Sequence, residues 1–139
     1  MKTNKLRSRW YSKKYIEENS KTELGAAIMS RQKWYTLSHC KMASLLKNEE
    51  PKCGLCIYHH SEIEGLIGRK KCSRCILREN GHKKENCYLG DGLYQSANAA
   101  LRHLRHSKRE SDFIEFQMLA QKMFELTDKC VKILEKENV

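Results

Sequence analysis

The sequence predicts a mainly α-helical chain with a small cysteine-rich centre. Apolar residues recur at helical spacing on both sides of this centre, and six of the seven glycines fall within residues 53–92. The same segment carries five of the seven cysteines. We therefore expect one domain over 1–139 in three parts: an N-terminal helical segment over 1–50, the cysteine-rich centre over 51–92, and C-terminal helices over 93–139.

The N-terminal segment predicts one main helix. Its helical face is formed by Trp34, Leu37, Lys41 and Leu45, with the aliphatic stem of the lysine lying along the stripe. With Ser30 as a candidate N-cap, this pattern predicts a helix over about 31–47. Pro51 is the only proline and marks the end of the segment near residue 50.

Two shorter amphipathic pieces are expected before that helix. Leu24 and Ile28 are four residues apart, as are Leu6 and Trp10, and each pair fits one face of a short helix. The break between the two pieces is expected at residues 19–20.

The end of the chain has the clearest helical pattern. Apolar residues repeat at alternating spacings of three and four at Phe116, Leu119, Met123, Leu126, Cys130 and Ile133. Further apolar residues widen this row into a broad stripe: Phe113, Ala120, Phe124, Val131 and Leu134. We predict a helix over about 112–136 and expect its stripe to pack on the helix around Trp34.

A further helical face precedes it, marked by Ala97, Ala100, Leu101 and Leu104. Because no glycine or proline intervenes, one unbroken helix over 93–137 and a helical hairpin are both compatible with the sequence. In the hairpin, Ser107 or Ser111 would cap the second helix.

The cysteines of the centre are spaced as metal ligands. Cys53 and Cys56 form one C-x2-C pair, and Cys72 and Cys75 form a second pair after fifteen residues. Two such pairs complete a closed tetrahedral shell around Zn²⁺, which is typical of a structural site rather than a catalytic one. The spacing fits either a treble-clef or a zinc-ribbon-like arrangement. Cys87 is an alternate ligand that could replace one of the four, bind a second ion, or pack as a small buried hydrophobe.

The cysteine count also bears on the compartment. Seven is an odd number, the first residues do not resemble a signal peptide, and no apolar run approaches the length of a membrane span. We therefore expect reduced thiols in a cytoplasm and no membrane association. Cys40 and Cys130 lie on predicted helices, where core packing explains them.

The net charge of +10 is unevenly distributed. Residues 66–109 carry 11 Lys and Arg against 3 Asp and Glu, whereas residues 110–139 carry 4 against 7. The basic side chains that could bind an anion or a partner are Arg69, Lys70, Lys71, Arg74, Arg78, Lys83, Lys84, Arg102, Arg105 and Arg109. Those near the second cysteine pair could instead offset the charge of a zinc tetrathiolate. The last three are spaced to share one side of a helix, which is also typical of a solvated helix face.

Recognisable catalytic motifs are missing from the sequence. It has no G-x-S-x-G, no H-E-x-x-H and no deaminase pair of H-x-E with P-C-x-x-C. Gly90, Asp91 and Gly92 are a candidate turn, and they lack the Lys-Ser/Thr ending of a phosphate-binding loop. The sequence therefore favours a binding protein over an enzyme.

The order of these motifs carries a resemblance. The elements are Lys33-Trp34 with Leu37, Cys53-Gly54-Leu55-Cys56, Cys72-Ser73-Arg74-Cys75 with Ile76-Leu77, then Cys87, and Tyr94 after Gly90. In this arrangement residues 33–95 resemble a loose group of small, mostly uncharacterised phage-encoded proteins. The resemblance implies a zinc-binding phage accessory protein, which would act in the host cytoplasm, and it gives Cys87 more weight as a ligand.

Two functional classes follow. In the first, the chain is a zinc-stabilised, non-enzymatic accessory protein that binds a host or phage macromolecule as a regulator, adaptor or anti-defence inhibitor. In the second, it is a nucleic-acid-binding zinc module that uses the basic residues of 66–109. Sequestration of a nucleotide by these residues is a further alternative. The apolar face of residues 113–134 could also form a homodimer.

Overall fold

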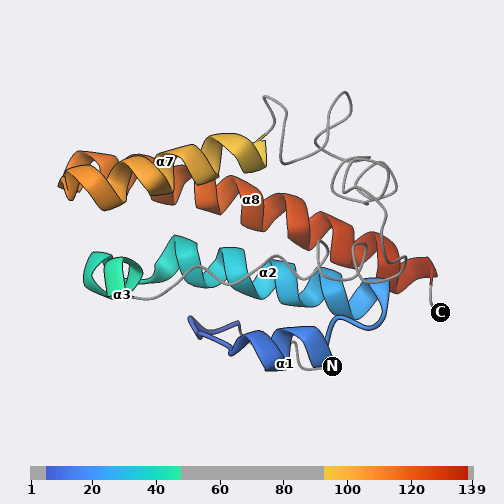
Figure 1. The fold of residues 1–139 in the computed structure, drawn as a ribbon. Coiled ribbons are helices and arrows are strands. Elements are labelled where there is room, and N and C mark those ends of the chain that lie inside the picture. Colours follow the sequence, from blue (N-terminus) through green and yellow to red (C-terminus); the bar gives the residue numbers. More distant parts are fainter. Residues whose placement is uncertain (1–5, 48–92, 138–139) are drawn as a thin grey trace, which may run out of the picture.

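The computed structural model describes residues 6–47 and 93–137 (Figure 1). Within these residues every assigned element is an α-helix: α1 (Lys13–Glu18), α2 (Glu23–His39), α3 (Met42–Lys47), α7 (Leu93–Ser107) and α8 (Glu110–Glu137). The mainly helical fold predicted from periodicity is therefore confirmed for this part of the chain. The predicted zinc centre over 51–92 lies outside the described residues.

Two long helices, α2 and α8, run side by side in opposite directions (Figure 1). Arg31 in the middle of α2 forms an ion pair with Asp128 near the end of α8, with 3.1 Å between Nη1 and Oδ1. At the other end, the side-chain amide of Gln117 donates a hydrogen bond of 2.9 Å to the carbonyl of Cys40. Helix α7 folds back along α8, and in Figure 1 α2 lies between α8 and α1.

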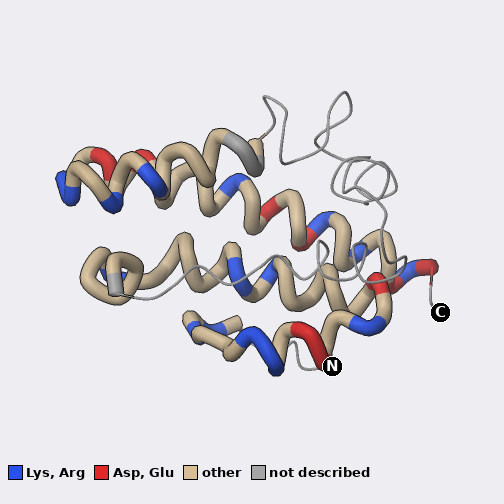
Figure 2. The backbone as a smooth tube through the Cα atoms, in the orientation of Figure 1, with Lys and Arg blue, Asp and Glu red and all other residues tan. Residues whose placement is uncertain are grey.

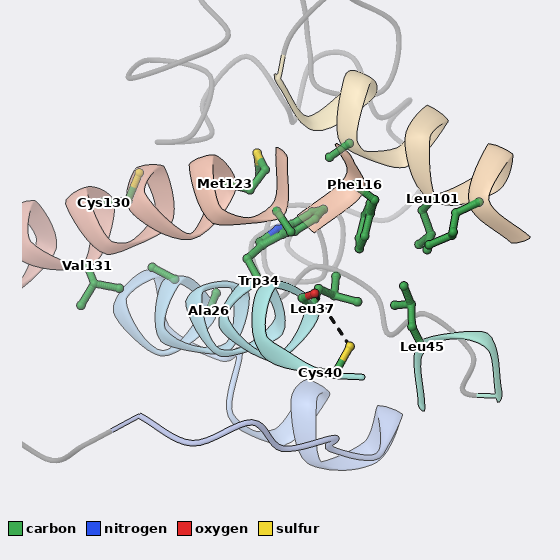
Figure 3. Packing of buried hydrophobic residues seen from close by; sticks show 14 of the residues in the cluster. Ala26, Trp34, Leu37, Cys40, Leu45, Leu101, Phe116, Met123, Cys130 and Val131 are labelled. Carbon is green, nitrogen blue, oxygen red and sulfur yellow. Dashed lines mark hydrogen bonds between the residues drawn. The ribbon is translucent and has the colours of Figure 1, made fainter. Parts of the chain in front are cut away.

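The core lies where α2, α7 and α8 meet (Figure 3). Trp34 is fully buried and points from α2 towards Phe116 and Met123 of α8, both of which are also fully buried. Leu101 of α7 and Leu45 of α3 close the same cluster. The predicted packing of the Trp34 helix on the C-terminal helix is confirmed, because each apolar stripe covers the other.

The same packing bears on the expected homodimer. Most of the broad stripe within 113–134 is buried inside a single chain, namely Phe116, Ala120, Met123, Cys130, Val131 and Leu134. The other stripe residues are only partly buried, so the homodimer through residues 113–134 stays a prediction: Phe113, Leu119, Phe124, Leu126 and Ile133. The two large apolar side chains of α8 that are exposed, Ile114 (53%) and Met118 (62%), lie on a different side of the helix and were not part of the predicted stripe.

The helix around Trp34 has different ends from those predicted. It begins at Glu23, where the Thr22 hydroxyl accepts a hydrogen bond of 3.0 Å from the Gly25 amide, so Ser30 is a buried residue in mid-helix and not an N-cap. Leu24 and Ile28 belong to this helix and do not form a separate piece.

The same helix ends earlier than predicted. Cys40 has extended backbone angles and caps α2, so the predicted helix over 31–47 is divided into α2 and α3. Gln117 of α8 donates to the carbonyls of Leu37 and Cys40, which satisfies acceptors at the end of α2. Leu45 still reaches the core from α3, whereas Lys41 is exposed and does not lie along the stripe.

Residues 6–12 form an irregular segment without helix or strand, and not the helix expected from Leu6 and Trp10. The indole Nε1 of Trp10 donates a hydrogen bond of 3.0 Å to the hydroxyl of Ser44 on α3. The first helix, α1, begins only after Ser12, whose hydroxyl accepts from the Tyr15 amide at 3.1 Å. The predicted break at residues 19–20 is confirmed, since Asn19 caps the end of α1.

Two buried polar side chains of α2 form hydrogen bonds with this irregular segment. The Thr36 hydroxyl accepts a hydrogen bond from the Arg9 amide and donates one to the Arg9 carbonyl, both at 2.9 Å. The Gln32 amide donates to the Arg7 carbonyl at 2.6 Å and to the Thr36 hydroxyl at 3.1 Å. Gln32 and Thr36 are 9% and 1% exposed, so these bonds form in a protected environment.

We expect Thr36→Val to lower the free energy of unfolding by about 1–3 kcal/mol, because the Arg9 amide and carbonyl would lose their partner. Urea unfolding followed by circular dichroism measures this difference. Thr36→Ser is the matched control, since it keeps the hydroxyl and should retain most of the stability. Equal stability of Thr36→Val and the parent would show that Thr36 does not hold residues 6–12 on α2.

The C-terminal half is a hairpin of two helices, which decides between the two alternatives left open by the sequence. Helix α8 covers 110–137 and confirms the predicted helix over 112–136. The helical conformation is interrupted between α7 and α8 at Lys108, which has a positive φ of 56° although it is not glycine.

Candidate anion-binding surface

The structure describes three of the ten basic residues predicted to bind an anion or a partner: Arg102, Arg105 and Arg109. The other seven lie outside the described residues, namely Arg69, Lys70, Lys71, Arg74, Arg78, Lys83 and Lys84. The predicted zinc ligands Cys53, Cys56, Cys72 and Cys75, with the alternate ligand Cys87, lie outside them as well.

The three described arginines do not share one helix. Arg102 is exposed and Arg105 is half-buried, both on α7, which ends at Ser107. The left-handed conformation of Lys108 then turns the chain, so Arg109 lies in the turn before α8. The predicted i, i+3, i+7 row is therefore interrupted at its last member.

Asp112 organises this turn. Its Oδ2 atom accepts hydrogen bonds from the Ser107 hydroxyl at 2.6 Å and from Arg109 Nε at 3.1 Å, and His103 Nε2 lies 3.4 Å away. The hydrogen bond from Ser107, with the charge and hydrogen bond of Arg109, lowers the pKa of the Asp112 carboxyl. A lowered pKa means that the carboxylate stabilises the turn at neutral pH. That contribution is lost as the pH falls through the folded-state pKa, below the ordinary value of 3.8.

The turn carries a concentrated positive charge. Residues 102–109 contain four Lys and Arg, two histidines and no acidic residue. Figure 2 shows basic residues, in blue on the backbone tube, at the end of the molecule where α7 meets α8. Arg102, Lys108 and the side chain of Arg109, which is 67% exposed, face solvent. We call residues 102–109 the hairpin turn. Its charge and exposure suit contact with a polyanion.

A hollow of about 460 Å³ lies beside the hairpin turn, between α7 and α8. Its wall includes His103, Asp112 and Glu115. The two carboxylates in this wall would repel an anion, so the hollow itself is not the candidate anion-binding site. Within residues 6–47 and 93–137, no three His, Cys, Asp or Glu side chains come together in a way that could hold a metal ion.

A second basic surface, not singled out from the sequence, lies at the start of the described chain. Residues 6–16 carry Arg7, Arg9, Lys13 and Lys14 and no acidic residue, and the four side chains are exposed. The signal was present in the sequence as an acid-free run of arginine, lysine and tyrosine. A charge balance over long segments does not reveal so short a run, because acidic residues follow it from Glu17 onwards.

The two described cysteines have the core roles predicted for them. Cys40 and Cys130 are buried and have free thiols. Burial raises the pKa of the Cys40 thiol, and it raises that of Cys130 to about 11. Both thiols are therefore neutral at pH 7, which suits packing and not nucleophilic chemistry.

The comparisons with known proteins do not place the chain in a family. No family model matches it, and searches of curated proteins and of solved structures find no match either. None of the described helices combines the length and apolar composition required to cross a membrane.

Proposed function

We propose that this chain is a non-enzymatic binding protein for an anionic macromolecule, and that nucleic acid is the partner its surface fits best. The observation that carries the proposal is the hairpin turn, in which Arg102, Lys108 and Arg109 are presented at the end of a helical hairpin. Asp112 bonds to the side chains of Ser107 and Arg109, and the Arg109 amide donates to the Ser107 hydroxyl, so less conformational entropy is lost when a partner binds this turn.

An acidic surface of a host or phage protein is the other partner compatible with this charge. Protein interfaces usually have an apolar centre, and among the described residues the large exposed apolar side chains are Tyr15, Ile114 and Met118. Ile114 and Met118 are one turn apart on α8, whereas Tyr15 lies on α1. This favours a polyanion over an apolar protein interface.

Zn²⁺ belongs to the same proposal. The spacing of Cys53, Cys56, Cys72 and Cys75 supports one structural ion per chain, with Cys87 as the alternate ligand. A metal-bound loop would hold the neighbouring basic residues, of which Arg69, Lys70 and Lys71 come just before the second pair, in a defined arrangement. These residues carry charge of the same sign as the hairpin turn, so both would attract a polyanion.

The proposal is tested by charge reversal in the hairpin turn. We expect the double variant Arg102→Glu/Lys108→Glu to weaken binding to a labelled 20-nucleotide DNA at least about tenfold in Kd. We also expect it to reduce the slope of log Kd against log salt by about two, because two phosphate contacts are lost. Fluorescence anisotropy over a range of salt concentrations measures both quantities.

The matched control is Lys129→Glu/Lys136→Glu, which makes the same change in charge at exposed positions near the end of α8. This control should bind nearly as well as the parent. If the two double variants lose the same affinity, the effect reflects net charge alone and the hairpin turn is not the binding surface. The triple reversal of Arg69, Lys70 and Lys71 to glutamate, with zinc content and helicity checked, tests the central cluster in the same assay.

A further inference from the structure

An ordered row of one arginine and two tyrosines lies on the surface at the start of the chain. The rings of Tyr11 and Tyr15 are stacked, with centroids 4.2 Å apart and planes at 7°. The guanidinium of Arg9 lies over the Tyr11 ring, 5.3 Å from its centroid. Tyr15 is 41% exposed, so its ring is accessible to a partner.

This row does not serve the core. Neither Tyr11 nor Tyr15 belongs to the core cluster or to the partly buried side chains packed against it. Core packing therefore does not explain why two aromatic rings are stacked in contact with water.

The backbone that carries the row is held in place from both sides. Thr36 of α2 bonds to both the amide and the carbonyl of Arg9, and Trp10 is bonded to Ser44 of α3. Tyr15 follows directly in α1, where its amide is bonded to the Ser12 hydroxyl. The rings are therefore positioned before any partner binds, which reduces the entropy lost on binding.

The charged residues that border this row are basic up to Lys14. Arg7, Lys13 and Lys14 are exposed and lie within two residues of Arg9, Tyr11 or Tyr15 in the sequence. The first acidic residues, Glu17 and Glu18, come only at the end of α1. Stacked aromatic rings with a basic border are the features with which proteins hold unpaired bases and their phosphates.

We propose that Arg9, Tyr11 and Tyr15 form a stacking platform for the bases of single-stranded nucleic acid, with Arg7, Lys13 and Lys14 contacting its phosphates. A single strand is the partner because its bases offer free faces to the exposed Tyr15 ring, whereas the bases of a duplex are already stacked on one another. An acidic protein surface would use the positive charge but not the rings. This inference rests on the proposed function, because it names the form of nucleic acid that the basic surface binds.

The test compares Tyr15→Ala with Tyr15→Phe in binding to a labelled 20-nucleotide oligothymidine, using the full chain. The alanine variant should weaken binding about tenfold in Kd, because base stacking on an aromatic ring is lost. The phenylalanine variant keeps the ring and should keep the parent's Kd. Both should retain the parent's helicity by circular dichroism, since Tyr15 is exposed and not part of the core. The parent should also bind the oligothymidine more tightly than a duplex of the same length.

The platform is overturned if Tyr15→Ala binds the oligothymidine as tightly as the parent, or if the parent prefers the duplex. In both cases the proposed function survives through the hairpin turn. If the parent shows no salt-dependent binding to either DNA, the proposed function fails and the platform with it. If poly-glutamate competes for the protein as well as the oligothymidine does and Tyr15→Ala is without effect, the partner is an acidic protein and the platform is rejected.

Discussion

Replacing Trp34 with alanine is expected to lower the free energy of unfolding by about 3–5 kcal/mol. Trp34 is fully buried between α2 and α8, and its removal would leave a cavity bordered by Phe116 and Met123. Lys33 Nζ also lies over the Trp34 ring at 4.9 Å and would lose this contact. Because small domains are stable by only about 5–15 kcal/mol, this single change should remove a large part of the stability.

Urea unfolding followed by far-ultraviolet circular dichroism measures the loss without relying on the fluorescence of the residue removed. Met118→Ala is a suitable control, because it also removes a large side chain from a helix but at a position that is 62% exposed. It should change the stability by no more than about 0.5 kcal/mol. A loss below about 1 kcal/mol for Trp34→Ala would mean that α2 and α8 do not pack as described.

The second large effect is expected from Cys72→Ser, which should abolish stoichiometric Zn²⁺ binding. Structural Zn²⁺ sites contribute about 10–16 kcal/mol of binding free energy in zinc-finger peptides, so a chain that loses one ligand should lose the order that the metal supplies. We expect one Zn²⁺ per parent chain and less than half of that in Cys72→Ser. Elemental analysis of protein purified under reducing conditions measures both.

Cys40→Ser provides the control for this experiment, because Cys40 is a buried free thiol at the end of α2 and should not contact the metal. It should keep the metal content of the parent. Loss of Zn²⁺ should also leave most of the helical signal, since the core side chains of α2, α7 and α8 contact one another directly. A parent chain without zinc would contradict the proposal of a metal centre. Zinc loss in Cys87→Ser but not in Cys72→Ser would mean that Cys87, and not Cys72, is the fourth ligand.

The end of the chain shows how far periodicity alone can lead. The row from Phe116 to Leu134 predicted a helix over about 112–136, and α8 covers 110–137. The two agree because every buried residue of α8 faces the same side, so apolar residues recur in the sequence at the period of the helix. The apolar residues of α7 predicted a helix for the same reason.

The boundaries around Trp34 show where periodicity fails. Residues 31–47 have one continuous apolar pattern, but the chain bends at Cys40, whose carbonyl receives a hydrogen bond from Gln117, 77 positions away. Residues 6–12 form no helix, and they contact α2 through Thr36, which bonds to Arg9 across 27 positions. Neither partner is visible in a local window of sequence.

The features of the candidate anion-binding surface were also only partly predictable from the sequence. The positive charge of the hairpin turn and the cysteine spacing were evident from residue types and intervals alone. The interruption of the arginine row was not, because it depends on the positive φ of Lys108 and on the hydrogen bond from Ser107 to Asp112. The stacking of Tyr11 on Tyr15 was not evident either, since it joins a residue outside any helix to a residue of α1.

The sequence by itself determined that the described part of the chain is mainly helical, that α8 presents a broad apolar stripe, and that residues 66–109 carry an excess of positive charge. These properties depend on composition and on spacing within a few turns of helix, where the intrinsic period sets which residues lie together. Only the tertiary structure decided that this stripe is used within one chain, where α2 ends, and which polar groups hold the first residues. Those outcomes depend on hydrogen bonds and packing between segments far apart in the sequence, whose partners become neighbours only when the helices meet.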